Sequence, residues 1–158
     1  MLHIVLFEPE IPQNTGNIAR TCAAIGADLH LVHPLGFRLD EKHLRRAGLD
    51  YWPLVTVVEH ASIEAFMAEH GNGHLFFFTK KARHPYQELA YPQDCWFVFG
   101  KESTGIDEEF LKEHEPDTVR IPIREAARSL NLSNSVAIAA YEYLRQWQFP
   151  GLSVSCSP

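Results

Sequence analysis

The sequence predicts an α/β fold in which helices flank a mostly parallel sheet, and three observations lead to this prediction. Short apolar runs rich in β-branched or aromatic residues recur along the chain and are bounded by glycine or proline, as strands are. Segments with helical spacing separate most of these runs, and strands that alternate with helices form a largely parallel sheet covered on both faces. The 158 residues, 46% of them hydrophobic, suffice for one buried core.

Six runs have the composition of buried strands, and five segments have the periodicity of helices. We expect strands over residues 3–7, 29–32, 54–58, 75–79, 95–99 and 118–121. We expect helices over residues 15–25, 41–47, 62–70, 107–114 and 134–148. These elements fit one domain over residues 1–151, followed by a loose tail over residues 152–158 that is small and polar.

The first strand leads through two prolines into the first helix. Asn14 or Thr15 is expected to cap that helix, because such side chains accept hydrogen bonds from the free N–H groups of a helix start. Apolar residues then recur at helical spacing and leave Arg20 on a different face. No glycine-rich turn follows this strand, so an adenosyl cofactor, if one binds, binds elsewhere.

The strand at residues 95–99 leads into a loop that contains two glycines. Gly100 ends the strand, and Gly105 precedes the acidic start of the next helix. Two glycines five residues apart indicate a tight loop at the C-terminal end of a buried strand. Open α/β sheets bind ligands at that end of their strands, so this loop is a candidate ligand site.

A run of polar and small residues at 128–135 leads directly into the apolar last helix. The run supplies side-chain caps and the free backbone N–H donors of a helix start, which together can hold a small ligand. A helix with more caps than it needs explains the run equally well, and Asn134 and Ser135 fit that role. The two segments described above favour the ligand site.

Three patterns in this order resemble the motifs of the SPOUT class of RNA methyltransferases. They are Asn-x-Gly-Asn-x-x-Arg at residues 14–20, Phe-Gly-x-Glu-x-x-Gly at residues 99–105, and Ile-Pro at residues 121–122 followed by Arg-Ser-Leu-Asn-Leu-Ser-Asn-Ser at residues 128–135. The opening at residues 4–17 and the segment at residues 44–51 resemble the TrmL (YibK-like) type, which methylates the ribose 2′-hydroxyl of the tRNA wobble nucleotide. The resemblance covers residues 2–151.

The resemblance implies a C-terminal trefoil knot, a homodimer, and S-adenosyl-L-methionine as the methyl donor, with S-adenosyl-L-homocysteine as the product. Methyl transfer to a ribose hydroxyl is an in-line displacement that needs aligned reactants and stabilisation of charge on the acceptor oxygen, and it needs no metal. The residues that the resemblance assigns to the cofactor are Phe78, Gly100, Ile121, Ser129, Leu130 and Ser133.

The resemblance also assigns three residues to catalysis, namely Arg20, Glu102 and Asn131. Arg20 is expected beside the acceptor ribose, where it contacts a phosphate or stabilises the developing alkoxide, because a guanidinium stays protonated and cannot act as a base. Glu102 is expected to orient Arg20 or another basic group. Asn131 is expected to supply hydrogen bonds to the ligand or to its loop.

The expected partner is tRNA, although the net charge of −6 argues against nucleic acid because phosphate binding draws on clustered Lys and Arg. Local clusters of basic residues weaken this objection, and a dimer brings the clusters of two chains around one RNA. The residues expected to contact RNA are Asn17, Arg20, Arg46, Lys80, Lys81, Arg83, Arg124 and Arg128.

We therefore expect an enzyme that methylates the 2′-hydroxyl of nucleotide 34, cytidine or uridine, in leucine tRNAs. Two alternatives stay open: methylation of another tRNA or rRNA position, and an RNA-binding or assembly factor without turnover. The sequence contains neither a membrane-spanning run nor a secretory signal, so we expect a cytoplasmic protein without membrane association. The nine histidines lack the spacing of metal motifs, so we expect them to be scattered and no metal to be bound.

Overall fold

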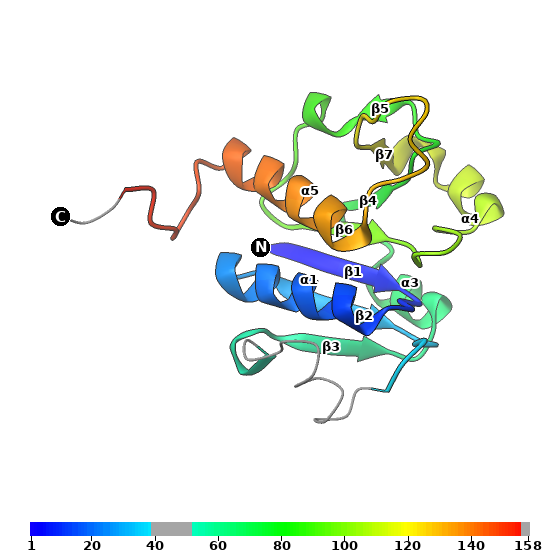
Figure 1. The fold of residues 1–158 in the computed structure, drawn as a ribbon, viewed down its shortest axis with the longest axis horizontal. Helices are drawn as coiled ribbons and strands as arrows, with labels where there is room; N and C mark the ends of the chain where they lie inside the picture. The colour runs from blue at the N-terminus through cyan, green and yellow to red at the C-terminus, as the bar shows by residue number, and fades with distance from the viewer. Residues whose placement is uncertain (39–51, 156–158) are drawn as a thin grey trace.

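The computed structural model describes residues 1–38 and 52–155, which form a layered α/β fold (Figure 1). In this part of the chain seven strands pair in parallel in the order β3-β2-β1-β6-β4-β7-β5, which confirms the predicted parallel sheet. The strands are β1 (Leu2–Phe7), β2 (Asp28–Val32), β3 (Val57–His60), β4 (Leu75–Phe78), β5 (His84–Pro85), β6 (Cys95–Phe99) and β7 (Thr118–Arg120). The helices are α1 (Pro12–Ile25), α3 (Ile63–His70), α4 (Glu108–Glu113) and α5 (Leu132–Gln146), with 3-10 turns η1 (Trp52–Leu54), η2 (Tyr86–Glu88) and η3 (Glu115–Asp117).

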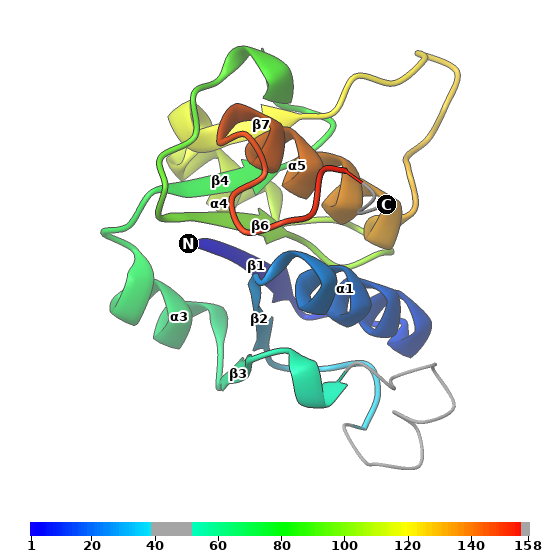
Figure 2. The same cartoon turned by 90° about the vertical axis from the view of Figure 1, so that its left-hand side faces the viewer.

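Strand β1 lies in the middle of the sheet and explains how both faces are covered. Its residues Leu2, Ile4 and Leu6 belong to the core shared with α1 and α5, whereas Val5 and Phe7 belong to the core shared with α3 and α4. Side chains alternate in direction along a strand, so one continuous apolar run supplies both cores. Figures 1 and 2 show the two helices of each pair on their own side of the sheet.

The strand order changes direction at the boundary between β1 and β6. Strands β2 and β3 extend the sheet from β1, while β4, β7 and β5 extend it from β6. Loops at the C-terminal ends of strands beside such a boundary form ligand-binding crevices. After β7 the chain returns across the sheet, and α5 packs against α1, β1 and β6. The trefoil knot expected from the resemblance stays a prediction.

Helix α1 begins at Pro12, three residues before the predicted start. Its N-cap residue is Ile11, which makes no side-chain cap hydrogen bond. Proline suits the first helical position because it lacks the N–H that would be left free there. The expectation that Asn14 or Thr15 caps this helix is wrong, since both residues lie inside the helix and both are buried.

Further differences from the prediction concern α5, β3 and β5. Helix α5 begins at Leu132, because Asn131 caps it by accepting hydrogen bonds from the N–H groups of Ser133 and Asn134. Strand β3 starts at Val57 rather than residue 54, because residues 52–54 form a 3-10 turn. The prediction lacks the edge strand β5, whose two residues form no apolar run. The predicted helix at residues 41–47 lies outside the described residues.

Two of the three cysteines belong to the core. Cys22 and Cys95 are free thiols, and burial raises the pKa of each to about 12. Both thiols therefore stay protonated and behave as small apolar side chains. Among the helices of the described residues, none combines the length and the apolar character that a membrane crossing requires.

Candidate active site

A cavity of about 590 Å³ opens at the C-terminal ends of β4, β6 and β7. A volume of this size suits a ligand such as a nucleoside cofactor. The wall combines apolar side chains from the strand ends with polar groups from the first turn of α1, the loops after β4 and β6, and the segment between β7 and α5. The cavity wall includes ten of the residues assigned from the sequence: Phe78, Lys80, Lys81, Gly100, Glu102, Ile121, Arg128, Ser129, Leu130 and Asn131.

Asn14 connects two of these loops from within the first turn of α1. Its Nδ2 donates to Oε1 of Glu102 over 3.1 Å, and its Oδ1 accepts from Nδ2 of Asn131 over 3.0 Å. A carboxylate accepts hydrogen bonds and cannot donate, so Glu102 dictates the orientation of both amides. Oδ1 of Asn131 is then left to accept from the backbone N–H and the hydroxyl of Ser133, at 2.9 and 2.7 Å. The three sequence patterns thus meet in one line of hydrogen bonds.

Glu102 fastens the loop after β6 to the segment before α1. Besides Asn14, it accepts hydrogen bonds from the backbone N–H groups of Glu10 at 2.8 Å and Ile11 at 3.2 Å. The partial positive charge at the start of α1 favours a carboxylate here. Glu102 therefore holds these two segments together, and its expected role in orienting Arg20 or another basic group stays a prediction.

The same two segments are joined a second time by reciprocal contacts. The Glu10 carboxylate accepts from the backbone N–H and the hydroxyl of Ser103, at 2.9 and 2.8 Å, and these bonds hold the pKa of Glu10 below its ordinary value. Lys101 forms an ion pair with Glu8, and this partner raises the pKa of Lys101. The loop after β6 is therefore held along most of its length.

Gly100 is required because the loop after β6 folds back onto its own start. A Cβ atom at Gly100 would lie 2.2 Å from the backbone nitrogen of Ile106 and 2.3 Å from the carbonyl carbon of Gly105. Gly105 has a φ of 76°, in the left-handed region that favours glycine, and its N–H donates to the carbonyl of Lys101 over 2.9 Å. The predicted tight loop is confirmed, and the close approach that Gly100 permits is to this loop.

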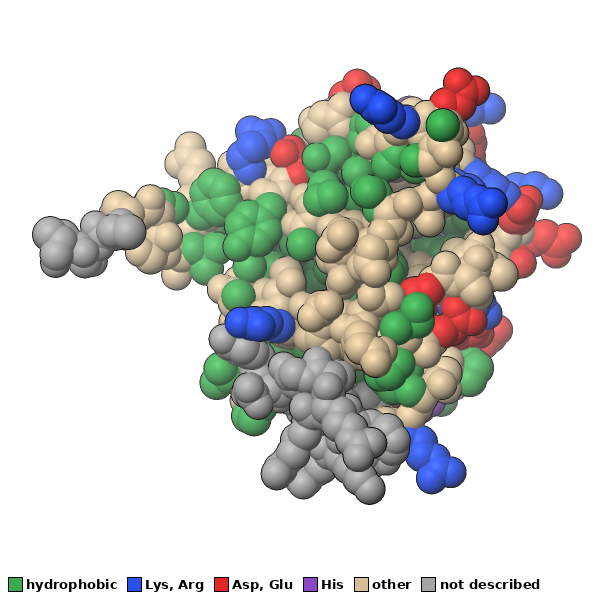
Figure 3. All heavy atoms as spheres, viewed as in Figure 1, with side chains coloured by type: hydrophobic (Ala, Val, Ile, Leu, Met, Phe, Trp, Pro, Cys, Tyr) green, Lys and Arg blue, Asp and Glu red, His purple; other side chains and the backbone are tan. Residues whose placement is uncertain are grey.

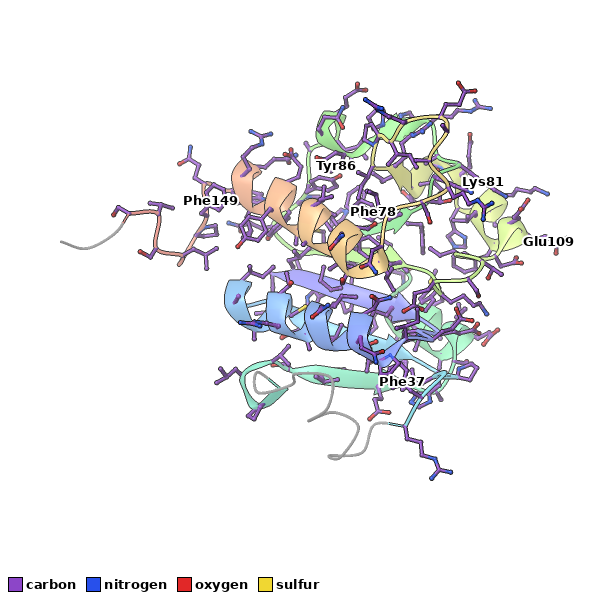
Figure 4. All side chains as sticks on the ribbon, viewed as in Figure 1. Phe37, Phe78, Lys81, Tyr86, Glu109 and Phe149 are labelled. Atoms are coloured by element: carbon purple, nitrogen blue, oxygen red, sulfur yellow. The ribbon has the colours of Figure 1, made fainter. Side chains whose placement is uncertain are left out.

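Five of the six residues assigned to the cofactor line the cavity, and the sixth, Ser133, lies behind its wall. Phe78 is buried at the cavity and stacks on Phe99 with ring centroids 4.6 Å apart (Figure 4). Gly100, Ile121, Ser129 and Leu130 belong to the wall, as noted above. Ser133 is buried beneath Asn131 and stands outside the wall, so it supports the loop through Asn131.

The basic residues at the cavity differ in how far their charges are already paired. Nζ of Lys80 donates to the backbone carbonyl of Arg128 over 3.3 Å, which keeps two cations at one rim of the cavity. Lys81 forms an ion pair with Glu108, and Arg83 lies 3.7 Å from Glu115. Lys80 and Arg128 are therefore the stronger candidates for phosphate contact.

Several other assigned residues stand outside the cavity wall. Asn17 and Arg20 are exposed on α1, and Arg124 is exposed between β7 and α5. Gly16, from the same pattern as Asn17, is buried within α1, whereas Gly105 and Ser129 both line the cavity. Arg46 lies outside the described residues.

Asn14 is one site residue that the sequence does not predict, because local rules assign it only to a helix cap. It is, however, the first residue of the Asn-x-Gly-Asn-x-x-Arg pattern, and its side chain can bind other partners when it does not cap the helix. Lys101 and Ser103 were missed as well, since single polar residues in a short loop carry no signal of the distant segment to which they bind.

Comparison with known proteins agrees with this geometry. The profile of the SpoU rRNA Methylase family matches residues 1–141. The tRNA (cytidine(34)-2'-O)-methyltransferase of Saccharophagus degradans is 46% identical over 152 residues, which cover 96% of this chain and 99% of the relative. The protein of the same name from Methylovorus glucosotrophus is 45% identical with the same coverage.

Solved structures of similar fold cover most of this chain as well. One described as "Structural insights into the 2-OH methylation of C/U34 on tRNA" has 46% identity and a TM-score of 0.88, with 94% of this chain and 97% of that chain covered. The SpoU methyltransferase AviRb from Streptomyces viridochromogenes, in complex with AdoMet, shares the fold with a TM-score of 0.78 at 24% identity, and 94% of this chain and 58% of that chain are covered. Because the family profile matches residues 1–141 and the relatives match nearly its whole length, the chain belongs to the SpoU methylase family.

Proposed function

We propose that this protein is an S-adenosylmethionine-dependent enzyme that methylates the ribose 2′-hydroxyl of nucleotide 34, cytidine or uridine, in tRNA, with leucine tRNAs as substrates. One observation carries the proposal: the first turn of α1, the loop after β6 and the start of α5 meet at one cavity and are joined through Asn14, Glu102 and Asn131. These three residues come from the three sequence patterns, one from each. A tRNA (cytidine(34)-2'-O)-methyltransferase that is 46% identical over 152 residues supports the choice of substrate.

The cavity fits S-adenosylmethionine in size and in chemistry. Its volume of about 590 Å³ lies in the range of nucleoside-sized ligands. Phe78 and Ile121 offer apolar surface for the adenine ring, while the backbone groups of Gly100, Ser129 and Leu130 lie at the wall where polar parts of the ligand need partners. The bound cofactor supplies an electrophilic methyl group, and the chain holds and orients it without a metal.

Arg20 and Arg128 supply positive charge for the RNA side of the reaction. Both guanidinium groups stay protonated, so they position phosphates and stabilise the developing alkoxide rather than remove a proton. Asn131 caps α5 and holds Asn14, and this fixes the loop that carries Ser129 and Leu130. Close alignment of methyl group and acceptor oxygen is the main contribution that such a rigid site makes to the rate.

The RNA is proposed to bind along the rim beside the loop that joins β7 to α5, where Lys and Arg side chains gather in Figure 3. Lys80 and Arg128 form the part of this surface that adjoins the cavity. Lys81, Arg83 and Arg124 extend it. Because the net charge is −6, the protein as a whole repels phosphate, and RNA binding depends on where these few cations lie.

A homodimer is proposed through α5, with the chain forming one domain over residues 1–151. Three large apolar side chains of this region are exposed by 36% (Ile138), 51% (Tyr141) and 36% (Trp147), while the opposite side of the helix is buried in the core. Figure 3 shows hydrophobic side chains gathered over this region. A second copy would cover them and bring its own basic residues to the RNA.

The proposal is tested by incubating the purified protein with labelled S-adenosylmethionine and total tRNA from a strain that lacks it. Methylated positions are then mapped by primer extension and mass spectrometry. We expect 2′-O-methylation at nucleotide 34 of leucine tRNAs. Asn131→Ala should reduce it strongly, and Gln93→Ala, an exposed amide outside the cavity wall, should not.

Two outcomes would contradict the proposal in different ways. Methyl transfer to another tRNA position, or to rRNA as the name of the family profile suggests, would refute the assignment of nucleotide 34. Cofactor binding without transfer to any RNA would refute the enzyme and favour an RNA-binding factor with the same fold.

A further inference from the structure

Four histidines that are far apart in the sequence meet on the side of the sheet that α3 covers. His3 lies on β1, His30 on β2, His60 on β3 and His70 at the end of α3. Their rings pack against Trp96 and one another with centroids 4.0 to 5.9 Å apart. The expectation of scattered histidines is wrong for these four, and none of them lines the cavity described above.

Three of the imidazoles form a chain that ends in a carboxylate on each side. Nε2 of His3 lies 3.3 Å from Oδ1 of Asp94, and Nδ1 of His3 lies 3.3 Å from Nε2 of His30. Nδ1 of His30 lies 3.0 Å from Nε2 of His60, whose Nδ1 lies 3.6 Å from Oε2 of Glu69. The chain thus has four links, and each imidazole nitrogen takes part in one of them.

Three hydrogen bonds determine where the protons of this chain lie. Asp94 accepts from Nε2–H of His3, so Nδ1 of His3 holds a lone pair and accepts from Nε2–H of His30. Nδ1 of His30 then accepts from Nε2–H of His60 over 3.0 Å, whereas Glu69 is too far from Nδ1 of His60, at 3.6 Å, for a hydrogen bond. A metal ion between His30 and His60 would take the place of the proton that they share, and that proton could move to Nδ1 of His60, which faces Glu69.

Burial favours the neutral form of the three imidazoles of the chain. It lowers the pKa of His30 to about 3, with repulsion from the neighbouring histidines adding to the effect. Burial also lowers the pKa of His3 and of His60. Neutral imidazole is the form in which histidine binds metal ions.

His70 completes a set of three metal ligands with His30 and His60, whose ligand atoms all lie within 4.8 Å of one another. Nitrogen ligands about 2.0–2.1 Å from Zn²⁺ stand about 3.4 Å apart in a tetrahedron, so the pair of His30 and His60 has nearly this spacing. The ligand atom of His70 lies within 4.8 Å of the other two, and its side chain would have to turn toward them as the ion binds. Glu69 lies 3.6 Å from both Nδ1 of His60 and Nε2 of His70, close enough for its carboxylate to become a hydrogen-bond partner of these histidines once the ion is bound.

A second set, formed by His3, Asp28 and His30, shares one histidine with the first. Oδ2 of Asp28 lies 3.7 Å from Nδ1 of His3, whereas Nε2 of His30 lies 3.3 Å from the same atom. Nδ1 of His3 is therefore the acceptor for His30 and has no lone pair left for a metal. The three-histidine set is the better site.

We propose that His30, His60 and His70 bind one divalent transition-metal ion of the class that prefers imidazole, with Zn²⁺ as the representative ion. The ion would join the end of α3 to β2 and β3 and so stabilise the edge of the sheet. It lies outside the methyl-transfer cavity and takes no part in that reaction. The hydrogen bonds that join Asp94, His3 and His30 orient His30, and the Glu69 carboxylate lies near His60 and His70.

The test titrates tag-free protein, treated with a chelator and then desalted, with ZnCl₂ by isothermal calorimetry. We expect one Zn²⁺ per chain and a higher melting temperature. His60→Gln and His70→Gln should each weaken binding roughly tenfold or more, and Glu69→Gln should weaken it to a smaller degree. His84→Gln, an exposed histidine on β5, serves as the control and should bind as the original protein does.

A spectroscopic measurement checks the location of the ion without relying on affinity alone. Trp96 stacks on His70 with ring centroids 4.2 Å apart, so Ni²⁺ at the site should quench its fluorescence, and Trp96→Phe should remove the quenched component. Circular dichroism and melting curves establish that each variant folds. The proposal is wrong if the original protein shows no saturable binding, or if folded His60→Gln and His70→Gln variants bind Zn²⁺ as tightly as the control.

Discussion

Asn131 donates a hydrogen bond from Nδ2 to Oδ1 of Asn14 over 3.0 Å, and this bond joins the first turn of α1 to the start of α5. The two residues are 117 positions apart in the chain. Asn14 also donates a hydrogen bond from its Nδ2 to Glu102. Because the carboxylate can only accept, each amide in the line has one orientation, and the loops on either side of the cavity have one relative position.

Asn14→Ala is expected to reduce methyl transfer more than it reduces stability. The change removes both the donor to Glu102 and the acceptor for Asn131, and it frees the two loops to move relative to each other. We expect kcat/KM to fall about 10- to 100-fold, which corresponds to about 1.4–2.7 kcal/mol of transition-state stabilisation. Transfer assays and calorimetric titration with S-adenosylmethionine measure the two effects.

Gln13→Ala is the matched control, because Gln13 lies next to Asn14 on α1 but is exposed and stands outside the cavity wall. Its kcat/KM should stay within about twofold of the original value, as expected for surface positions of this kind. Equal losses in the two variants would mean that the line from Glu102 to Asn131 has no part in the reaction.

Gly100→Ala and Gly105→Ala should differ, although both place a methyl group in the same loop. The Cβ of Ala at position 100 would lie 2.2 Å from the backbone nitrogen of Ile106, so the loop must shift. At Gly105 nothing lies within 4 Å of the added Cβ. Alanine there lowers the free energy of unfolding only because it must adopt a left-handed φ, which costs about 1–2 kcal/mol.

We therefore expect Gly100→Ala to weaken the binding of S-adenosylmethionine at least tenfold, while Gly105→Ala lowers the melting temperature with a smaller loss of affinity. Calorimetric titration and thermal melting of both variants measure these two quantities. A Gly100→Ala protein that binds the cofactor normally would show that the loop after β6 does not form the site.

The fold could be predicted in its main features because six of the seven strands of the described residues lie in apolar runs that the sequence shows. Buried parallel strands are apolar throughout, as in β1 and β6, and such runs are visible without knowledge of their neighbours. Strand β3 starts later than predicted because pairing with β2, where Leu29 meets Val57, sets the first residue. Strand β5 is defined entirely by its pairing with β7, so its sequence carries no pattern.

The site was less predictable than the fold because its contacts are long-range. Local rules assign Asn14 to a helix cap, whereas its partners lie 88 and 117 positions away. The histidine cluster was not predicted for the same reason, because His30 and His60 are 30 positions apart and are brought together by the pairing of two strands. Motif spacing within one helix or loop does not reveal such groups.

Thr15→Val is expected to leave stability unchanged or to raise it by up to about 1 kcal/mol. Thr15 is buried in α1, and within the described residues its hydroxyl oxygen has no hydrogen-bond partner. Valine has the same shape without the buried polar group, so the desolvation penalty disappears. Urea unfolding at fixed protein concentration measures the difference.

Thr118→Val provides the contrast, because the Thr118 hydroxyl is also buried but donates to the carbonyl of Glu115 over 2.8 Å. This change should cost about 1 kcal/mol, since it removes this hydrogen bond and leaves the carbonyl of Glu115 with only the backbone N–H of Thr118 as a donor. If Thr15→Val destabilised the protein as much as Thr118→Val, the Thr15 hydroxyl would have to make a hydrogen bond after all.

The ion pair of Glu142 with Arg145 predicts a pH-dependent stability. Nε and Nη2 of Arg145 each donate to one oxygen of Glu142 over 2.8 Å, and Gln146 donates to the same carboxylate over 2.8 Å. The hydrogen bonds from Arg145 are the largest cause that lowers the pKa of Glu142 from its ordinary 4.5, and those from Gln146 add to it. The folded state therefore binds the proton less readily than the unfolded state.

A lowered folded pKa means that the contribution of Glu142 is fully present above about pH 4.5 and is lost as the pH falls through the folded value. Glu142→Gln removes the titrating group and should lower the free energy of unfolding by about 1 kcal/mol at pH 7. The difference between the two proteins should then shrink between pH 5 and pH 3.5, roughly the window set by the unfolded pKa of a glutamate. Urea unfolding across this range measures it, with Glu113→Gln at an exposed position of α4 as the control. A difference that stays constant with pH would show that the Glu142 carboxylate contributes no more as an ion than as a neutral hydrogen-bonding group.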